Sequence, residues 1–510
     1  MKCGKNGGKI VSMSKRIDMS DIRRTFRYMK RNGLRGAYFA AKERMKLRAE
    51  SRYSYICPDE GELANQRNET RDLEGEPSIT VVIPAYEPNP VYFRKAVESV
   101  INQSYPHWRL VITDGSPSDR TYDIYKEFES DPRITYVKHE GDSGISANTN
   151  TGIEAALAQI AAAEPDHEST EPDYESTGSE AGCPNAYIGF LDHDDELTPD
   201  ALYHMAKAAM GRGRSATCAA QERLSDESPV LVYSDEDKMS EPDPATRLYF
   251  DPHTKYDFNF DLLLSNNYIC HFMMVRADVM QNMRFRSEYD GAQDYDLALR
   301  IAADIFRQDR SSESGTNAID LEKFIAHVPR ILYHWRSHTG STATNTESKR
   351  YAYEAGLRAL TDAVNGLFGA LPRITHSKHL GFYDIDWGDP DTLFSLRPDV
   401  GAVIGRVLDV HGRMKECIYD KDRNALYAGL NNNFSGEFNR FDCAQDVYSA
   451  DIKHVIVRPE LKDTLQAFQG RITGNAVADS QTAAEFATRL HDRGYRILYL
   501  PHMITREKRS

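Results

Sequence analysis

The sequence predicts an α/β fold in which a mostly parallel, doubly wound sheet is flanked by helices. Three observations lead to this prediction: short β-branched runs recur along the chain, helical stretches separate them, and proline or glycine follows several of the runs. Alternation at this spacing is typical of right-handed βαβ units. The first expected strands are 79–84, 109–113, 134–138 and 187–191, and the expected helices between them are 91–102, 119–129 and about 145–162.

The later part of the chain continues the same alternation. The expected helices are 199–210, a stretch that starts at 293, and 349–366, and the expected strands are 230–233, an apolar run within 257–276, and 326–335. Polar stretches rich in Pro, Ser, Thr or Gly interrupt the pattern at 164–185, 211–228 and 308–320. Because such stretches cannot bury enough apolar surface to fold, we expect them to be disordered surface insertions.

Length and composition set the broad class. A chain of 510 residues accommodates two or three domains, and 27% charged with 40% hydrophobic residues is ordinary for a water-soluble protein. The formal charge of −14 argues against nucleic acid as the main partner. Seven widely spaced cysteines without a CxxC pair favour a reducing compartment and no structural zinc site. With no long apolar run and no secretory signal, the sequence predicts a cytoplasmic location.

The charge is concentrated at the N-terminus. Residues 1–50 carry about +11, which leaves the rest of the chain near −25. Aromatic and aliphatic residues lie between the cations of 15–50, so basic amphipathic helices are expected. Two interpretations remain open: peripheral contact with the inner face of the cell membrane through 15–50, or a solvated helical pair packed on the main domain.

We therefore predict three parts. Residues 1–76 form a basic helical segment with an acidic connector at 58–76, residues 77–370 form the main α/β domain with the insertion at 164–185, and residues 371–510 form a C-terminal α/β unit.

A group of acidic residues stands out within the main domain. Residues 187–196 read YIGFLDHDDE, so Asp192, Asp194 and Asp195 directly follow an expected buried strand. The C-terminal ends of strands in open α/β sheets are where ligands bind, and hard carboxylate oxygens suit Mg²⁺ or Mn²⁺. The alternative is an acidic turn that caps the following helix.

A second acid, Asp294, opens the helix expected from 293. An acid at a helix N-terminus is often only a cap, because it interacts favourably with the helix dipole. The acids after the strand at 230–233, Asp235 and Asp237, fit either a border of the acceptor site or a solvated acidic turn.

Six motifs in order make the chain resemble a family 2 glycosyltransferase with the GT-A fold, a Rossmann-like α/β fold, and most closely the bacterial branch that builds rhamnose-rich or other cell-surface polysaccharides. The motifs are VVIPAYEP, ITDGSPSD, GISANTNTGI, GFLDHDDEL, GAQDYDLALR and LYHWRSHTGSTA, and they span residues 78–366.

The resemblance implies roles for individual residues. A divalent metal, Mn²⁺ or Mg²⁺, would be bound by Asp192, Asp194 and His334, and Asp294 would be the catalytic base that takes the proton of the acceptor hydroxyl. The nucleotide-sugar would contact Pro84, Tyr86, Glu87, Asp114, Asn150, Asp192, Arg336 and His338. This chain departs from many relatives in having Thr113 before Asp114 and Gln293 before Asp294.

The resemblance implies an inverting, metal-dependent enzyme. It would transfer a sugar from a UDP- or dTDP-sugar to a lipid-linked or polysaccharide acceptor, with no role for nucleic acid. A sugar nucleotidyltransferase fits less well, because PAYEPNP is not the Gly-rich basic loop that such enzymes carry after the first strand. A non-catalytic scaffold subunit of a glycan-assembly complex is the remaining alternative.

The C-terminal unit contains a weaker similarity. Residues 400–406, 428–436 and 485–501 resemble the acceptor half of a second glycosyltransferase domain, without its strand–PxY, DXD or base motifs. We interpret 371–510 as a degenerate, non-catalytic repeat, and an unrelated α/β extension is the alternative.

Overall fold

The computed structural model describes residues 19–50, 53–71, 76–141, 144–163, 185–211, 228–240, 247–311, 321–337, 350–369 and 372–507. Within these ranges, no helix combines the length and hydrophobicity needed to cross a lipid bilayer. The expected disordered insertions lie almost entirely outside the described residues, as does His338.

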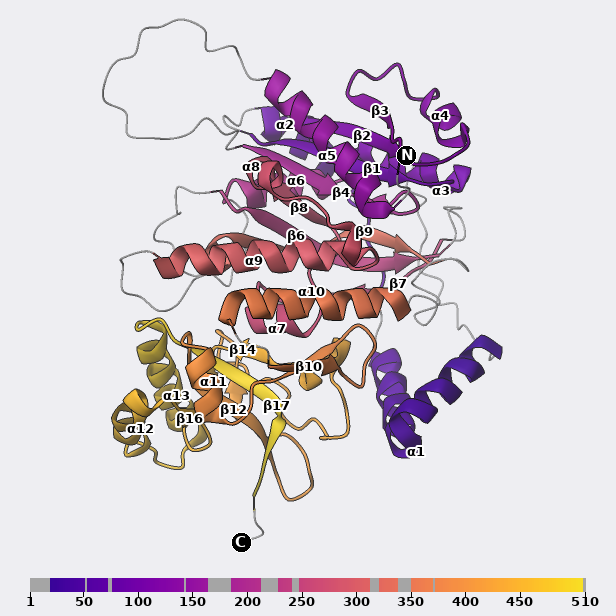
Figure 1. The fold of residues 1–510 in the computed structure, drawn as a ribbon. Helices are drawn as coiled ribbons and strands as arrows, with labels where there is room; N and C mark the ends of the chain where they lie inside the picture. The colour runs from indigo at the N-terminus through magenta and orange to yellow at the C-terminus, as the bar shows by residue number, and fades with distance from the viewer. Residues whose placement is uncertain are drawn as a thin grey trace, which may run out of the picture.

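The main domain is built on a nine-stranded sheet in the order β3-β2-β1-β4-β8-β6-β9-β5, with β7 paired to β6 (Figure 1). Four of the eight strand pairs in this sheet are parallel, namely β3–β2, β2–β1, β1–β4 and β6–β9, and the four pairs that involve β8, β7 or β5 are antiparallel. The alternation of these strands with helices confirms the predicted α/β fold class. The strands are β1 (Ser78–Ala85), β2 (Trp108–Asp114), β3 (Ile134–Lys138), β4 (Ala186–Phe190), β5 (Glu196–Leu197), β6 (Leu231–Met239), β7 (Tyr249–His253), β8 (Met273–Arg276) and β9 (Ile325–Arg336).

The chain reverses its winding direction at β1, because β1 pairs in parallel with β2 on one side and with β4 on the other. Such a reversal opens a crevice beyond the C-terminal ends of the strands, where open α/β sheets bind ligands. The acidic residues that follow β4 therefore lie at the ligand-binding edge of the sheet.

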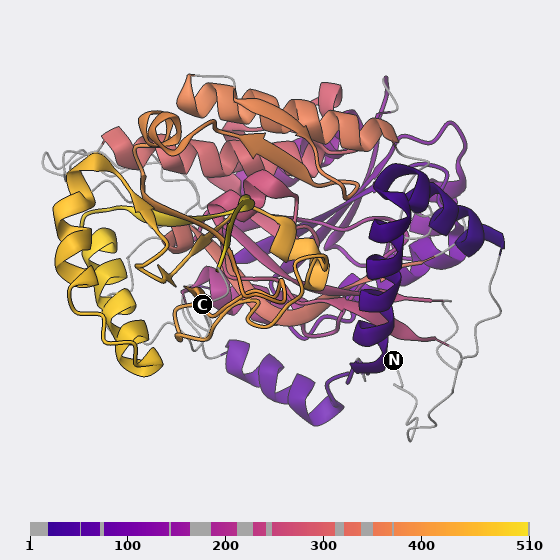
Figure 2. The ribbon, with the colours of Figure 1, turned by 90° about the horizontal axis from the view of Figure 1, so that it is seen from below.

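Helices cover both faces of this sheet (Figures 1 and 2). Alternate residues of β1 separate the two cores: Ile79 and Val81 pack with α3 and α6, whereas Val82 packs with α5 and α9. The helices are α3 (Pro90–Ile101), α4 (Arg120–Tyr125), α5 (Ile145–Ala162), α6 (Ala201–Ala209), α7 (Phe260–Ser265), α8 (Ala277–Asn282), α9 (Gln293–Ser311) and α10 (Arg350–Phe368).

The C-terminal unit has its own sheet, in the order β14-β17-β12-β16, and its own apolar core. Its regular elements are β10 (Arg373–His376), β11 (Tyr383–Asp386), α11 (Pro390–Leu396), β12 (Val400–Leu408), β13 (Ile418–Tyr419), β14 (Gln445–Val447), β15 (Ser449–Ala450), β16 (Ile456–Val457), α12 (Lys462–Gln469), α13 (Ala476–His491) and β17 (Arg496–Arg506). It packs beneath α7 and α10 of the main domain (Figure 1).

The N-terminal segment forms α1 (Met19–Glu50), which is divided at Gly33, where φ is +72°. Its second half is attached to the C-terminal unit: the Glu43 carboxylate accepts hydrogen bonds from the backbone N–H groups of Ser435 and Gly436 at 2.9 and 2.8 Å. Figure 2 shows the two arms of α1 at the side of the molecule.

Three expectations about local structure were wrong. The connector at 58–76 contains a helix, α2 (Glu60–Arg71). The apolar run at 257–276 divides into α7 and β8, because a short apolar run does not distinguish strand from buried helix. The strand from 230 continues to Met239, so Asp235 and Asp237 are buried strand residues and not a solvated turn.

Candidate active site

The acidic turn after β4 brings three carboxylates together. Asp192, Asp194 and Asp195 each offer an oxygen atom within 4.8 Å of the other two. Burial raises the pKa of Asp195 well above its usual value, and the charges of Asp194 and Asp192 add to this effect. Burial and the nearby Asp194 also raise the pKa of Asp192. A bound divalent cation would relieve this crowding of like charges, so the oxygen-rich set fits Mg²⁺ or Mn²⁺.

Asp195 supports the turn from beneath. Its carboxylate accepts a 2.5 Å hydrogen bond from the Tyr333 hydroxyl and a 2.7 Å hydrogen bond from the Arg336 backbone N–H. The side chain is fully buried. These two contacts come from β9, so the end of β9 fixes the shape of the turn and leaves Asp192 and Asp194 as the candidate metal ligands.

Arg336 has a different role from the one expected of it. Only 1% of the residue is exposed. Its Nε donates to the backbone oxygen of Asp194 at 2.7 Å, and its guanidinium pairs with the Glu196 carboxylate. An arginine that is buried and already bonded in this way is not available to a phosphate. The predicted phosphate contact is therefore corrected: Arg336 holds the acidic turn in place.

The prediction that His334 completes the metal shell also needs correction. Its Nδ1 lies 2.5 Å from Asp237 Oδ1, and the ring packs between Tyr55 and Tyr249 with centroid distances of 4.5 Å. The cause is the alternation of side chains along β9: Tyr333 faces the acidic turn, and the next residue must face away from it. His334 is not part of the carboxylate group at the turn.

Asp294 lies beside the acidic turn, although about a hundred residues separate them in sequence. It sits in the first turn of α9, where its Oδ2 accepts a 3.0 Å hydrogen bond from Asn267 Nδ2. His271 connects the two: its Nε2 is 3.9 Å from Asp192 Oδ2, and it groups with Cys270 and Asp294 within 4.8 Å. The structure thus brings two of the three expected metal ligands, Asp192 and Asp194, together with the expected base in one site.

Gln293, which precedes Asp294, makes its contact with the turn before α9. The Gln293 Oε1 accepts a hydrogen bond from the Gly291 N–H at 2.8 Å, which closes the turn before α9. Gln293 therefore belongs to the helix start.

The ends of β1 and β2 form the other half of the crevice. Tyr86 is 48% exposed beyond β1, and Glu87, with φ of +43°, accepts hydrogen bonds from Ser118. Asp114, at the end of β2, is fully buried and accepts from the Tyr136 hydroxyl at 2.7 Å and from Lys138 Nζ at 3.0 Å.

The hydrogen bonds to Asp114 also keep it ionised. Burial by itself raises the pKa of this carboxyl, but the bonds from Ser116 and Tyr136 bring the pKa below its usual value. Pro84 lies next to the acidic turn, because its backbone oxygen is 3.3 Å from His193 Nδ1. Pro84, Tyr86, Glu87 and Asp114 are thus gathered at one edge of the sheet.

Asn150 is not available to a nucleotide. Its Nδ2 donates to the Phe285 backbone oxygen at 2.8 Å, and its Oδ1 accepts from the Phe285 N–H at 2.9 Å. The predicted contact of Asn150 is therefore corrected. The asparagine of α5 that lies at the end of β1 is Asn148, whose Nδ2 donates to the Ala85 oxygen at 3.0 Å. The buried Oδ1 of Asn148 has no hydrogen-bond partner among the described residues.

The periodicity of helix α5 could have indicated that Asn148, and not Asn150, faces the sheet. Gly152 packs so closely on the sheet that an added Cβ would lie 2.5 Å from Val82 Cγ1, and the residue four earlier in the helix shares that face. Tyr136 and Lys138 are the other site residues that the sequence left without an assigned role, and they become visible only when β3 is placed beside β2. The sequence offered Asn267 and His271 as candidates for the sugar pocket, and the structure places them beside Asp294 and Asp192.

Part of this chain matches a known protein family. Residues 80–166 match the family model described as glycosyl transferase family 2. An uncharacterized protein named y4gI from Sinorhizobium fredii is 33% identical over 365 residues, which cover 69% of this chain and 33% of that protein. The O-antigen biosynthesis protein RfbC of Myxococcus xanthus is 28% identical over 295 residues, which cover 57% of this chain and 18% of that protein.

The chain thus spans a third or less of the length of these two relatives. Among solved structures, residues 1–349 of TarS from S. aureus align with 12% identity over 57% of this chain and 66% of that chain. The TM-score is 0.35, which is too low to equate residue positions.

Proposed function

We propose that this chain, in which residues 80–166 match the model of glycosyl transferase family 2, transfers a sugar from a nucleotide-sugar to a lipid-linked or polysaccharide acceptor during cell-surface glycan synthesis. The observation that supports this most is the single site formed by Asp192, Asp194 and Asp294, connected through His271. The relative named for O-antigen biosynthesis supports the cell-surface product class.

In this proposal Asp192 and Asp194 bind a divalent metal, Mg²⁺ or Mn²⁺. When bound, the metal supplies positive charge that offsets the developing charge of a diphosphate leaving group. The contributions of the chain are positional. Asp195 and Arg336 hold the turn, and the crevice at Pro84, Tyr86, Glu87 and Asp114 receives the nucleoside.

Asp294 is the proposed general base. Its carboxylate accepts the proton of the attacking acceptor hydroxyl while Asn267 holds one oxygen in place. One base and one direct displacement invert the anomeric centre, so we expect the product linkage to have the opposite configuration to the donor. Product NMR that shows a retained configuration would contradict this mechanism.

The donor and the metal are tested by calorimetric titration. We expect the purified protein to bind one sugar nucleotide from a panel of UDP-, dTDP- and GDP-sugars in the presence of Mn²⁺ or Mg²⁺. EDTA, or Asp194→Ala, is expected to weaken binding at least about tenfold, because the diphosphate loses its counter-charge.

Asp123→Ala is the matched control, because Asp123 is an exposed carboxylate on α4 whose side chain is 67% accessible. Its binding should equal that of the unmodified protein. Donor binding that is equally tight with EDTA would refute the metal role, and no binding across the panel would refute the enzyme proposal.

We further propose that α1 rests on an anionic membrane surface. Its exposed side chains combine apolar groups with cations. The exposed apolar residues are Phe26, Leu34, Tyr38 and Met45, and the exposed cations are Lys30, Arg31, Arg35, Lys42 and Arg44. A helix of this kind binds where lipid headgroups are negative and acyl chains are within reach.

Vesicle sedimentation tests the membrane proposal. The protein is expected to sediment with phosphatidylglycerol vesicles and to remain in solution with phosphatidylcholine vesicles. Since each basic residue near an anionic surface contributes about 1 kcal/mol, the double variant Arg31→Glu/Arg35→Glu should bind over tenfold more weakly. The control Arg471→Glu/Arg489→Glu changes the same charge on the C-terminal unit. Equal binding to both lipids, or no binding to either, would contradict the proposal.

A further inference from the structure

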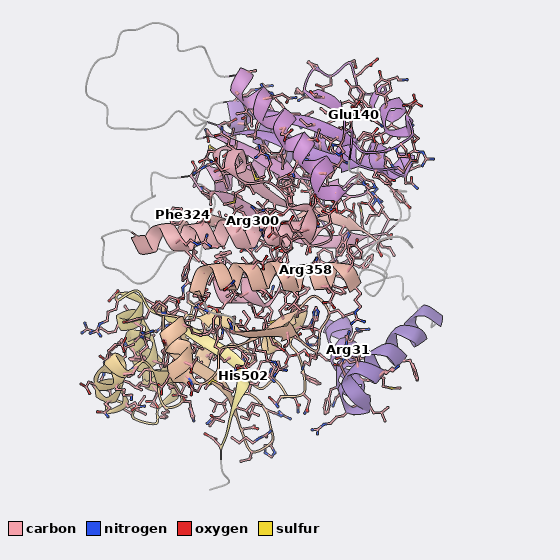
Figure 3. The ribbon with its side chains drawn as sticks, viewed as in Figure 1. Arg31, Glu140, Arg300, Phe324, Arg358 and His502 are labelled. Carbon is pink, nitrogen blue, oxygen red and sulfur yellow. The ribbon has the colours of Figure 1, made fainter. Side chains whose placement is uncertain are left out.

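An open cavity of about 470 Å³ lies where the main domain meets the C-terminal unit. Its wall comes from α7, from the β10–β11 hairpin, and from β12 and β17 of the C-terminal sheet. Figure 3 labels His502 on β17, below the helix α10 that carries Arg358. A cavity of this size is in the range of small-molecule binding sites.

Two of the acids that line the cavity are already neutralised. The Asp442 carboxylate pairs with Lys378 at 2.8 Å and with Arg406 at 2.7 Å. The Asp261 carboxylate is held by both nitrogens of the Arg397 fork, at 2.7 and 2.9 Å. The four of these groups that line the cavity, Asp261, Asp442, Lys378 and Arg406, form a polar wall in which the charges balance.

The polar side chains at the rim of the cavity form fewer hydrogen bonds and ion pairs than those of the wall. Arg373, Asp384 and His502 form no side-chain hydrogen bond or ion pair with another described residue, and all three are exposed. Asp386 accepts one hydrogen bond from the Gly388 N–H. Arg373 and His502 therefore offer N–H donors to the same space in which Asp384 and Asp386 offer carboxylate acceptors.

The apolar part of the wall comes from Tyr383, Ile385, Trp387 and Leu500. Carboxylates beside apolar surface would repel a phosphate or a nucleotide. Paired donors and acceptors, by contrast, match a neutral molecule that carries many hydroxyl groups, because each hydroxyl both donates and accepts. The chemistry of the cavity is that of a neutral saccharide site.

The cavity adjoins the site of the proposed reaction. Asn267, which bonds to Asp294, follows α7 by two residues, and α7 supplies Leu264 and Ser265 to the cavity wall. On the other side, the Tyr383 ring stacks on Tyr295, the residue after Asp294, with centroids 6.0 Å apart. The segment from α7 to Asn267 and the contact of Tyr383 with Tyr295 thus connect the cavity wall to the surroundings of the candidate base.

We propose that this cavity binds a neutral saccharide segment of the acceptor, away from the end that receives the new sugar. The identification of the ligand as part of the acceptor rests on the proposed transferase function. The C-terminal unit would then contribute to acceptor recognition, because β10, β11, β12 and β17 supply most of the polar wall.

Binding of saccharides to the full-length protein tests this proposal without donor or metal. The probe is an array of neutral and acidic oligosaccharides from bacterial envelope polysaccharides, with UDP and inorganic phosphate as soluble competitors. We expect the protein to bind neutral oligosaccharides, Asp384→Ala and His502→Ala to weaken that binding at least tenfold, and neither competitor to displace it.

Asp391→Ala and His411→Ala are the matched controls, since both residues are exposed on the C-terminal unit outside the cavity wall. They should bind like the unmodified protein. Thermal unfolding of all four variants checks that the fold is retained, which is expected because the substituted side chains are exposed. No neutral saccharide binding, undiminished binding by the cavity variants, or displacement by phosphate would each overturn the proposal.

The experiments distinguish a failure of the proposed transferase function from a failure of the proposed saccharide site in the cavity. If donor titration finds no sugar nucleotide but array binding is lost in the cavity variants, the saccharide site stands and the transferase function falls. If the donor binds through Asp194 but the cavity variants bind saccharide normally, only the cavity proposal falls.

Discussion

Asp294→Asn is expected to lower the rate of sugar transfer by about 10²–10⁴-fold while donor binding stays within about twofold. The amide keeps the size of the carboxylate at the start of α9, but it cannot accept the proton of the acceptor hydroxyl. Single-turnover release of the nucleotide in the presence of acceptor measures the chemical step, and the calorimetric titration measures donor binding.

A matched control for this variant lies on the same helix. Asp304 is exposed and pairs with Arg307 at 2.8 Å, so Asp304→Asn should leave both measurements unchanged. Transfer by Asp294→Asn at the unmodified rate would mean that another group accepts the proton. Loss of donor binding together with transfer would instead assign Asp294 to the donor site.

Arg397→Met is expected to lower the free energy of unfolding by about 3–5 kcal/mol. Arg397 is fully buried between the main domain and the C-terminal unit. Its guanidinium binds Asp261 of α7 on one side and Asp399, next to β12, on the other, at 2.7–3.0 Å. Removing the cation leaves the buried Asp261 carboxylate without its ion-pair partner and leaves Asp399 with only Arg496, whose Nε is 3.9 Å away. This loss of counter-charge is costlier than the loss of the contacts themselves.

The pH dependence of this variant has a defined sign. In the unmodified protein the Arg397 guanidinium brings the pKa of Asp399 below its usual value despite burial, so this pair stabilises the fold at neutral pH and loses its effect as the pH falls. Without Arg397, burial raises the pKa of Asp399 above its unfolded value. The deficit of Arg397→Met should therefore shrink between about pH 7.5 and pH 5.

Urea unfolding at the two pH values measures this effect. Arg471→Met is the control, because Arg471 forms an exposed pair with Glu485, and such pairs contribute about 0–1 kcal/mol. Equal stability of Arg397→Met and the control would show that the buried pair does not join the two units. A deficit that grows at low pH would contradict the assignment of the cost to unpaired carboxylates.

Local sequence patterns were sufficient for the framework of the main domain. β3 begins and ends where the β-branched run does, and β1, β2 and β4 lie within one or two residues of their expected bounds. Residues 80–166, which contain the first three of the six motifs, match the model of glycosyl transferase family 2, as the resemblance indicated. Parallel strands are hydrophobic over nearly their whole length, so they are visible without knowledge of the fold.

Local sequence patterns could not identify contacts between segments that lie far apart in the chain. Whether Arg336 faces a phosphate or the Asp194 backbone depends on the position of β9 against the turn after β4, more than a hundred residues earlier. Whether Asn150 or Asn148 faces the crevice depends on the rotation of α5 on the sheet, and the packing of Gly152 on Val82 sets this rotation. The assigned roles of Asp192, Asp194 and Asp294 remain predictions.

The sequence by itself determined the α/β class, the resemblance to a glycosyltransferase family and the acidic residues at the strand ends, because each of these is encoded in short runs of neighbouring residues. The tertiary structure decided which polar side chains are free and which are already bonded. An imidazole such as His334 can bind a metal and a guanidinium such as Arg336 can bind a phosphate. In this fold, however, His334 is already bonded to Asp237 and Arg336 to Glu196. A buried polar group must be paired, and its partner is set by the packing of elements far apart in the chain.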